Sequence, residues 1–440
     1  MSFAGKLFSR SVIIVGLRLF SAGLMFATQA YIARRLGSDK LGQFTEVTAI
    51  INILSVVTPL GFQVVATYFA VEYVTRAQGG VLRRFLTQSY LQIVAMFAVL
   101  LVADMIGLPL AVFGGSIAAH WFSICLMAFA LALVYVSGSV LVAARRPILA
   151  IIGDILIRPL IVAGAVAIAL VAMQPEGVLA GMFRIMSAAF FAVALVYVAA
   201  AIVCARRVPG EESASAEERR RWWRFAAPWV VIAVVSDNFF DLDILLLADL
   251  LSYSELAVFG VMARVFALAA FGVGAVYTIA LPDVFEAEVR SDRSGFEANI
   301  FRANMVATAL ACALLAGIAA TAPVLLAIFG PEFVAGAGPL TLLCGALVVR
   351  SVFGPSALVL SLRDRPYAPL PSVALGVISL ALGNLLLAPP FGLYGAALSA
   401  VIAISIWSVA MWLTALRLTG VDTSILPGLV SALRRSRLVF

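Results

Sequence analysis

The sequence predicts an all-α integral membrane protein with about 12 transmembrane helices in two parallel six-helix lobes around a central cavity. Of the 440 residues, 63% are hydrophobic and 12% are charged, whereas soluble domains carry roughly 25% charged residues. Apolar runs of about the 20 residues that a bilayer requires recur along the whole chain. They lack the period-two alternation of barrel strands, and lipid offers the backbone no hydrogen-bond partners, so each run is expected to be a helix.

The apolar runs fall into two sets of six, joined by a polar stretch. We expect the spans at residues 11–33, 41–70, 82–106, 117–143, 148–172 and 178–204, and then at 225–249, 255–281, 303–329, 339–361, 367–388 and 392–416. The predicted organisation is an N-terminal lobe (1–205), a cytoplasmic linker (206–224), a C-terminal lobe (225–420) and a cytoplasmic tail (421–440). Trp222 and Trp223 end the linker, where indoles are expected at the lipid headgroups. Pro59-Leu60-Gly61 is expected to bend the second span.

The basic residues predict the orientation of the chain. Most of the 30 lysines and arginines fall in connections on the side of the N-terminus, and the opposite connections hold only Arg34, Arg35 and Lys40. The positive-inside rule then places both termini in the cytoplasm of a bacterial inner membrane. This distribution also accounts for the net charge of +7 without nucleic acid as a partner.

The two halves resemble each other at a shift of 215 residues. Four residues near the first two spans fall on identical residues in the second half, and so do a proline and a glycine further on: Ala33, Leu36, Leu41, Phe44, Pro175 and Gly177 match Ala248, Leu251, Leu256, Phe259, Pro390 and Gly392. Six spans per repeat keep both halves in one orientation, related by an axis along the membrane normal. A substrate path between two such repeats is typical of transporters.

Several segments carry a resemblance to a known family. They are Ala33 to Phe44 (ARRLGSDKLGQF) with Pro59-Leu60-Gly61, Ile151 to Leu160 (IIGDILIRPL), Leu256 to Ala263 with Pro282, and Phe391 to Ala397 (FGLYGAA). The chain resembles the Wzx-type polysaccharide and O-antigen flippases of the multidrug/oligosaccharidyl-lipid/polysaccharide (MOP) exporter superfamily, although Ala257 and Phe259 stand where Gly and Tyr are common. The resemblance implies alternating access, a cavity lined mainly by helices 1, 2, 7 and 8, and an undecaprenyl-pyrophosphate-linked glycan as cargo.

Charged residues inside spans are the candidate substrate-binding residues, because each costs roughly 2.5–3.5 kcal/mol on insertion scales. Arg18 and Arg264 are expected to hold the pyrophosphate at different depths, since the guanidinium fork suits phosphate oxygens; the alternative is a structural ion pair with a cavity acid. Arg350 is a further candidate for cargo contact, against a structural role. Glu46 and Asn52 on the second span are weaker candidates.

Two carboxylates are the candidates for ion coupling. Asp237 and Asp241 lie four residues apart, which places them on one face of a continuous helix. Ionising both carboxylates is unfavourable because their like charges repel, so one is expected to bind a proton or a sodium ion. The alternative is pairing with Arg264 or Arg18. Asp154 and Arg158 have the same spacing on the fifth span and favour an internal, structural ion pair.

Other function classes fit the sequence less well. No Gly-rich lysine loop for nucleotide phosphates is present, and the four cysteines form no metal-like cluster, so no cofactor or metal is expected. The short periplasmic connections argue against a membrane enzyme. A multidrug exporter of the same superfamily and a major-facilitator-type carrier remain as alternatives. Expected partners are the lipid-linked glycan, membrane lipids and the polysaccharide polymerase machinery, while the sugar, the pathway and the coupling ion stay open.

Overall fold

The computed structural model describes residues 3–174, 177–290, 292–363, 365 and 367–426, and within them the chain is helical, without strands. Eight helices of the described part are long and apolar enough to cross a membrane, or nine if one bent pair counts as a span. The all-helical membrane architecture predicted from composition is therefore confirmed. The chain divides into two compact units, Met1–Leu242 and Asp243–Phe440.

The first unit contains the predicted spans 1 to 6 and the start of the seventh. Its elements are α1 (Phe3–Leu36), α2 (Ser38–Val57), α3 (Phe62–Thr75), α4 (Gly79–Met105), α5 (Leu108–Ala119), α6 (Trp121–Ala143), α7 (Pro147–Ile152), a π-helix (Gly153–Ile157), α8 (Arg158–Ala172), α9 (Val178–Arg206) and α10 (Ala216–Asp237). Helix α6 is the centre of this unit, since 83% of its apolar window is buried and it packs against α2, α3, α4 and α9. An apolar helix buried on all sides is the core of a bundle.

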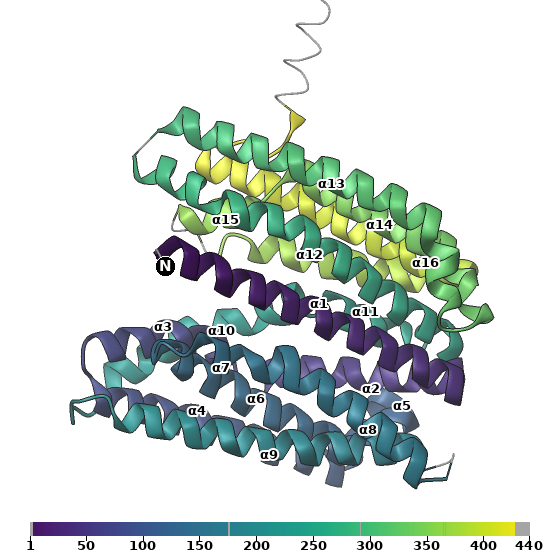
Figure 1. Cartoon of the computed structure of the whole chain (residues 1–440), viewed down its shortest axis with the longest axis horizontal. Helices are drawn as coiled ribbons and strands as arrows, with labels where there is room; N and C mark the ends of the chain where they lie inside the picture. The colour runs from purple at the N-terminus through teal and green to yellow at the C-terminus, as the bar shows by residue number, and fades with distance from the viewer. Residues whose placement is uncertain (1–2, 175–176, 291, 364, 366, 427–440) are drawn as a thin grey trace, which may run out of the picture. The chain divides into compact units, whose positions relative to one another are not determined.

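The second unit contains the remaining spans. Helix α11 (Phe239–Leu247) runs across the division, and α12 (Tyr253–Val289), α13 (Arg293–Ala327), a 3₁₀ helix (Pro331–Gly336), α14 (Ala337–Phe353), α15 (Ser356–Leu362) and α16 (Leu370–Thr419) follow. Helix α14 packs on α13 and α16, and these long helices run side by side in Figure 1. The 50 residues of α16 hold the last two predicted spans, because Gly392 at φ 54° and ψ −131° interrupts the helix where the sequence divided them.

The predicted bend at Pro59-Leu60-Gly61 is confirmed. Helices α2 and α3 meet at this break at an angle of 41°, and both Leu60 (φ 52°) and Gly61 (φ 81°) adopt the left-handed region. A Cβ on residue 61 would meet the backbone carbonyl of Ala226 on α10. Glycine therefore serves two purposes here, a positive φ and a close helix approach.

The fifth span is interrupted where Asp154 lies. A π-helix of five residues, Gly153–Ile157, joins α7 to α8, and Pro159 occupies the first turn of α8. Proline has no N–H, and its ring clashes with the carbonyl four residues earlier, so the backbone widens ahead of it. Such π-bulges inside α-helices are frequent at functional sites.

The predicted seventh span is not one helix, which corrects the argument that placed Asp237 and Asp241 on one helical face. Helix α10 ends at Asp237, Asn238 leaves the helical region (φ −123°, ψ 31°), and α11 begins at Phe239. Asparagine side chains compete with the helical backbone for hydrogen bonds, which makes such a residue a natural break. The two carboxylates thus belong to different helices.

Helix α10 begins at Ala216, within the predicted linker, and packs on α2 and α3 of the first unit. Ser215 caps the helix by accepting from the Glu218 N–H at 3.0 Å. Trp222 is fully buried, and its indole N–H donates to the Tyr73 hydroxyl at 2.6 Å. The division between the units accordingly lies inside α11, beyond the predicted linker.

An ion-pair cluster accompanies this buried indole. The Arg221 guanidinium binds Glu72 at 3.0 Å and Glu218 at 3.1 Å and lies over the Phe69 ring. Burial by itself disfavours the charged form, but the hydrogen bonds to Glu72 outweigh it and hold the pKa of Arg221 above its ordinary value. The start of α10 is therefore fastened to α3 by both apolar and ionic contacts.

Candidate functional site

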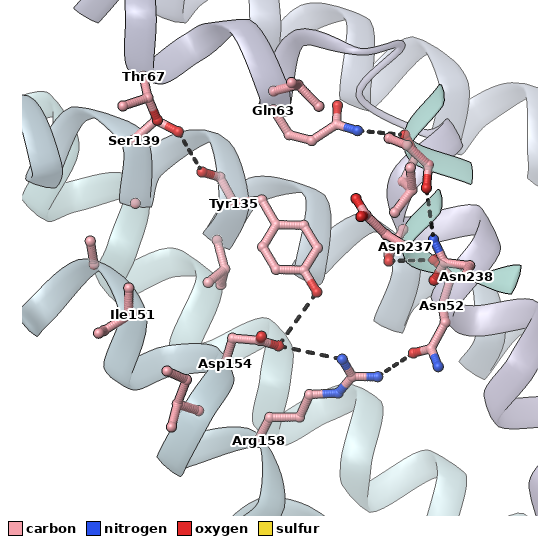
Figure 2. A pocket seen from close by; sticks show the side chains of 18 of the residues that line it. Asn52, Gln63, Thr67, Tyr135, Ser139, Ile151, Asp154, Arg158, Asp237 and Asn238 are labelled. Atoms are coloured by element: carbon pink, nitrogen blue, oxygen red, sulfur yellow. Dashed lines mark hydrogen bonds and ion pairs between the residues drawn. The ribbon is translucent and has the colours of Figure 1, made fainter. Parts of the chain in front are cut away.

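A polar cavity of about 580 Å³ lies within the first unit. Its walls come from α1, α2, α3, α6, α7, the π-helix, α8, α10 and the start of α11, and Figure 2 shows many of the side chains that face it. Five charged side chains line it: Arg18, Asp154, Arg158, Asp237 and Asp241. Ionisable groups in membrane-spanning segments are expensive and mark substrate or ion pathways, so this cavity is the candidate site.

A chain of four polar side chains crosses the cavity. Arg158 donates from Nη1 to Asp154 Oδ1 at 3.4 Å and from Nη2 to the Asn52 carbonyl oxygen. The amide nitrogen of Asn52 in turn donates to both carboxylate oxygens of Asp241, at 3.1 and 3.2 Å. The network joins residues 52, 154, 158 and 241, which lie on four separate elements; Figure 2 shows its Asp154–Arg158–Asn52 part.

Tyr135 extends the network onto the central helix α6. Its hydroxyl donates to Asp154 Oδ1 at 3.4 Å, so Asp154 accepts from both Tyr135 and Arg158. The Ser139 hydroxyl donates to the Tyr135 carbonyl at 3.2 Å, and Gln63 on α3 donates to the Val56 carbonyl at 3.0 Å, across the α2–α3 break. Buried polar networks that are well satisfied hold their members in fixed positions.

The structure brings together four of the seven predicted site residues. Arg18, Asn52, Asp237 and Asp241 all line the cavity, although the two aspartates reach it from the two sides of the Asn238 break. Glu46 is buried on α2, at 4% exposed, and is absent from the lining residues.

Two predicted arginines lie in the second unit. Arg264 is on α12 and Arg350 is in the last turn of α14, directly before the break at Gly354. Their expected contact with cargo stays a prediction.

Sequence reasoning found the Asp154–Arg158 pair but took it for an internal brace of one span. The pair does form, at 3.4 Å, and it also faces the cavity and reaches Asn52 on α2. Tyr135 was missed altogether. An isolated tyrosine in an apolar run gives no sequence signal, because only packing decides whether its hydroxyl meets a carboxylate.

A second buried polar pair lies in the second unit. Asn384 on α16 donates to Asp243 at 2.7 Å, and both residues are almost fully buried. Among the described residues, no group of three or more His, Cys, Asp or Glu side chains is arranged to hold a metal ion.

No family model and no curated protein matches the sequence, but solved structures match the fold. A multidrug resistance MATE family transporter of the MOP superfamily, in an inward-facing conformation, superposes with a TM-score of 0.75 at 12% identity, over 90% of this chain and 93% of that one. The lipid II flippase MurJ, in an inward closed conformation, gives 0.71 at 14% identity, over 91% and 87%. The chain has the fold of the MOP-superfamily transporters.

A further MOP-superfamily transporter, from Pyrococcus furiosus, matches with a TM-score of 0.58 at 13% identity, over 91% of this chain and 92% of that one. Its structure is described as having a binding pocket of reversed polarity, indicative of a different function. The observed fold agrees with the fold that the sequence-based resemblance implies, and the expected two-lobe, all-helical fold class is confirmed. Membership of the Wzx-type branch stays a prediction.

Proposed function

We propose that this protein is a flippase that moves an undecaprenyl-pyrophosphate-linked oligosaccharide from the cytoplasmic to the periplasmic leaflet of a bacterial inner membrane, for surface polysaccharide synthesis. The observation that carries the proposal is the cavity of the first unit, where Arg18 and Arg158 face one polar space within apolar helices. Guanidinium groups in a low-dielectric cavity favour an anionic cargo, and their fork matches phosphate oxygens. A fold shared with a lipid II flippase is consistent with a lipid-linked substrate.

The residue roles follow from this cargo. Arg18 contacts the pyrophosphate, and Arg264 and Arg350 contact the cargo from the second unit. Asp237 and Asp241 exchange a proton or a sodium ion, which supplies the driving force in a chain without a nucleotide-binding motif. Asn52 fixes Asp241 by its two hydrogen bonds. Both termini lie in the cytoplasm, and the polymerase machinery receives the product.

A second candidate function is export of cationic drugs, and one observation favours it. The same cavity carries three carboxylates, Asp154, Asp237 and Asp241, against two guanidinium groups. A cationic compound would be held by such acids, as expected for a multidrug exporter with this fold. In the lipid-flippase proposal, Asp154 is the ion-pair partner of Arg158 at 3.4 Å, and the two remaining acids, Asp237 and Asp241, serve ion coupling.

The test is a deletion of the gene in its native host, followed by analysis of surface polysaccharide and of extracted lipid-linked oligosaccharide. We expect loss of the surface polymer and accumulation of a completed carrier-linked unit. Plasmid copies with Arg18→Ala should fail to restore export. As the matched control, Arg290→Ala should restore it, because Arg290 is exposed, lies just after α12 and forms its ion pair with Glu286 of that helix. A normal surface glycan with new sensitivity to cationic drugs would overturn the proposal in favour of drug export.

A further inference from the structure

Asn52 stands between a guanidinium and a carboxylate, and its amide can satisfy both in only one orientation. The carbonyl oxygen accepts from Arg158, while the NH₂ group donates to the two oxygens of Asp241. If the amide were flipped, its NH₂ would face the guanidinium, a donor against a donor, and its oxygen would face the carboxylate, an acceptor against an acceptor. Arg158 therefore fixes which end of Asn52 meets Asp241.

The orientation of this amide determines which form of Asp241 is favoured. A carboxylate that accepts two N–H bonds is favoured in its ionised form. The oxygen of the same amide, which could accept from a protonated Asp241, already accepts from Arg158. Proton uptake by Asp241 therefore works against the orientation in which Arg158 holds the Asn52 amide.

We propose that Arg158 is a positioning residue that acts through Asn52 to set the pH at which Asp241 takes up its proton. The inference rests on the proposed ion coupling at Asp241, and it extends that proposal to a residue outside the coupling pair. Arg158 attracts Asp241 through its charge, and in addition it holds the amide that donates to Asp241. In a transport cycle, a cargo phosphate that draws Arg158 away would release Asn52 and so ease protonation of Asp241.

Other charged and titratable groups of the cavity act on Asp241 as well, and the experiment has to separate them. Besides Arg158, they come from four of the elements that line the cavity: Arg18 on α1, Tyr135 on α6, Asp154 on the π-helix and Asp237 on α10. Asp154 needs the closest control, because it is the ion-pair partner of Arg158. Any change at Arg158 therefore alters the titration of Asp154 too.

The proton is followed directly, in the full-length protein reconstituted in lipid. Infrared difference spectra across a pH series record the carbonyl stretch of protonated carboxylic acids, and the part that disappears in Asp241→Asn belongs to Asp241. All variants carry Asp154→Asn, so that the lost ion pair adds no signal. The readout needs no transport, so failure of the flippase proposal and failure of this inference remain distinguishable.

We expect Arg158→Gln to move the midpoint of the Asp241 signal toward higher pH by about one unit, roughly the effect of losing one N–H bond to the ionised carboxylate. Arg158→Lys should restore most of the original midpoint, because an ammonium group also donates to the amide oxygen. Asn52→Ala should produce a shift of its own. In the Asn52→Ala background, Arg158→Gln should produce a clearly smaller shift than in the parent, because only the direct attraction of the charge remains.

Three results would overturn the inference. The first is an unchanged midpoint in Arg158→Gln; the second is a shift of full size when Asn52 is already alanine, which would make the effect a direct field. The third is the lack of any titrating Asp241 signal in the parent protein. If the Arg158→Gln protein does not fold, Asn52→Ala alone tests the mechanism. This variant removes the two hydrogen bonds from Asn52 to Asp241, so an unchanged midpoint in Asn52→Ala refutes the mechanism.

Discussion

Two neighbouring tryptophans at the start of α10 test whether the linker is packed on the first unit or lies at the membrane surface. The perturbation is Trp222→Ala, compared with Trp223→Ala as the matched control. Trp222 is fully buried, whereas Trp223 is 39% exposed. If both indoles lay at the headgroups, as the sequence alone predicts, the two substitutions would cost similar amounts.

The magnitude follows from the buried area. A fully buried tryptophan removes roughly 200 Å² from water, which at about 25 cal/mol per Å² is about 5 kcal/mol. Trp223 keeps about three-fifths of its area covered, or about 3 kcal/mol by the same coefficient. The Trp222 indole also donates to the Tyr73 hydroxyl at 2.6 Å, and such a bond contributes about 1 kcal/mol. Trp222→Ala should therefore cost about 2 to 3 kcal/mol more than its neighbour.

The assay is equilibrium unfolding in mixed micelles, with the helical signal followed as denaturing detergent is added. Tyr73→Phe is the second variant: it removes the hydroxyl that Trp222 contacts and leaves the rings in place. In a double-mutant cycle, Trp222 and Tyr73 should couple, and Trp223 and Tyr73 should not. Equal losses for the two tryptophans, or a larger loss for Trp223, would refute the reasoning that places α10 against α3.

Two further predictions concern single backbone features. Gly61→Ala should destabilise the first unit by more than about 1 kcal/mol, because a positive φ and the Ala226 carbonyl both oppose a Cβ; Gly164→Ala, in open space within α8, should be neutral or stabilising in the same unfolding assay. At the start of α13, hydrogen bonds from the Gly295 backbone hold the pKa of Asp292 below its ordinary value. The cap is thus complete above the ordinary pKa of about 4 and disappears as pH falls through the lower folded value. The protection factor of the Gly295 amide, which compares its hydrogen exchange with the intrinsic rate at the same pH, should fall in acid, and pH-independent protection in the wild type would contradict the assignment.

Much of the membrane architecture followed from the sequence, because hydropathy acts locally. Each apolar run must close its own backbone hydrogen bonds in lipid, so the positions of most spans needed no tertiary information. Two proline and glycine breaks could also be predicted from the sequence. Helices α2 and α3 are bent at Pro59-Leu60-Gly61, and Gly392 divides α16. The break at Asn238 was missed, because one asparagine in an apolar run is compatible with an unbroken helix.

Only part of the candidate site could be predicted from the sequence, because its side chains come from helices that are distant in sequence. Arg18, Asn52, Asp237 and Asp241 stood out as polar residues within spans, and packing brings them into one cavity. Spacing along a helix explained Asp154 and Arg158 as a pair, but it could not show that Arg158 also reaches Asn52, which is 106 residues distant in sequence. Such partners are decided by which helices pack together.

The sequence by itself determined that this is a helical membrane protein, where most of its spans begin and end, and which side chains are costly enough to require a purpose. Those properties depend on local composition and on the solvent that each segment meets. Only the tertiary structure decided that Trp222 is a core residue, that α10 belongs with the first unit, and that Asn52 joins Arg158 to Asp241. Hydrogen bonds and ion pairs between distant segments form only when the helices pack together. The residue pattern of one segment therefore does not predict which other segment it will contact.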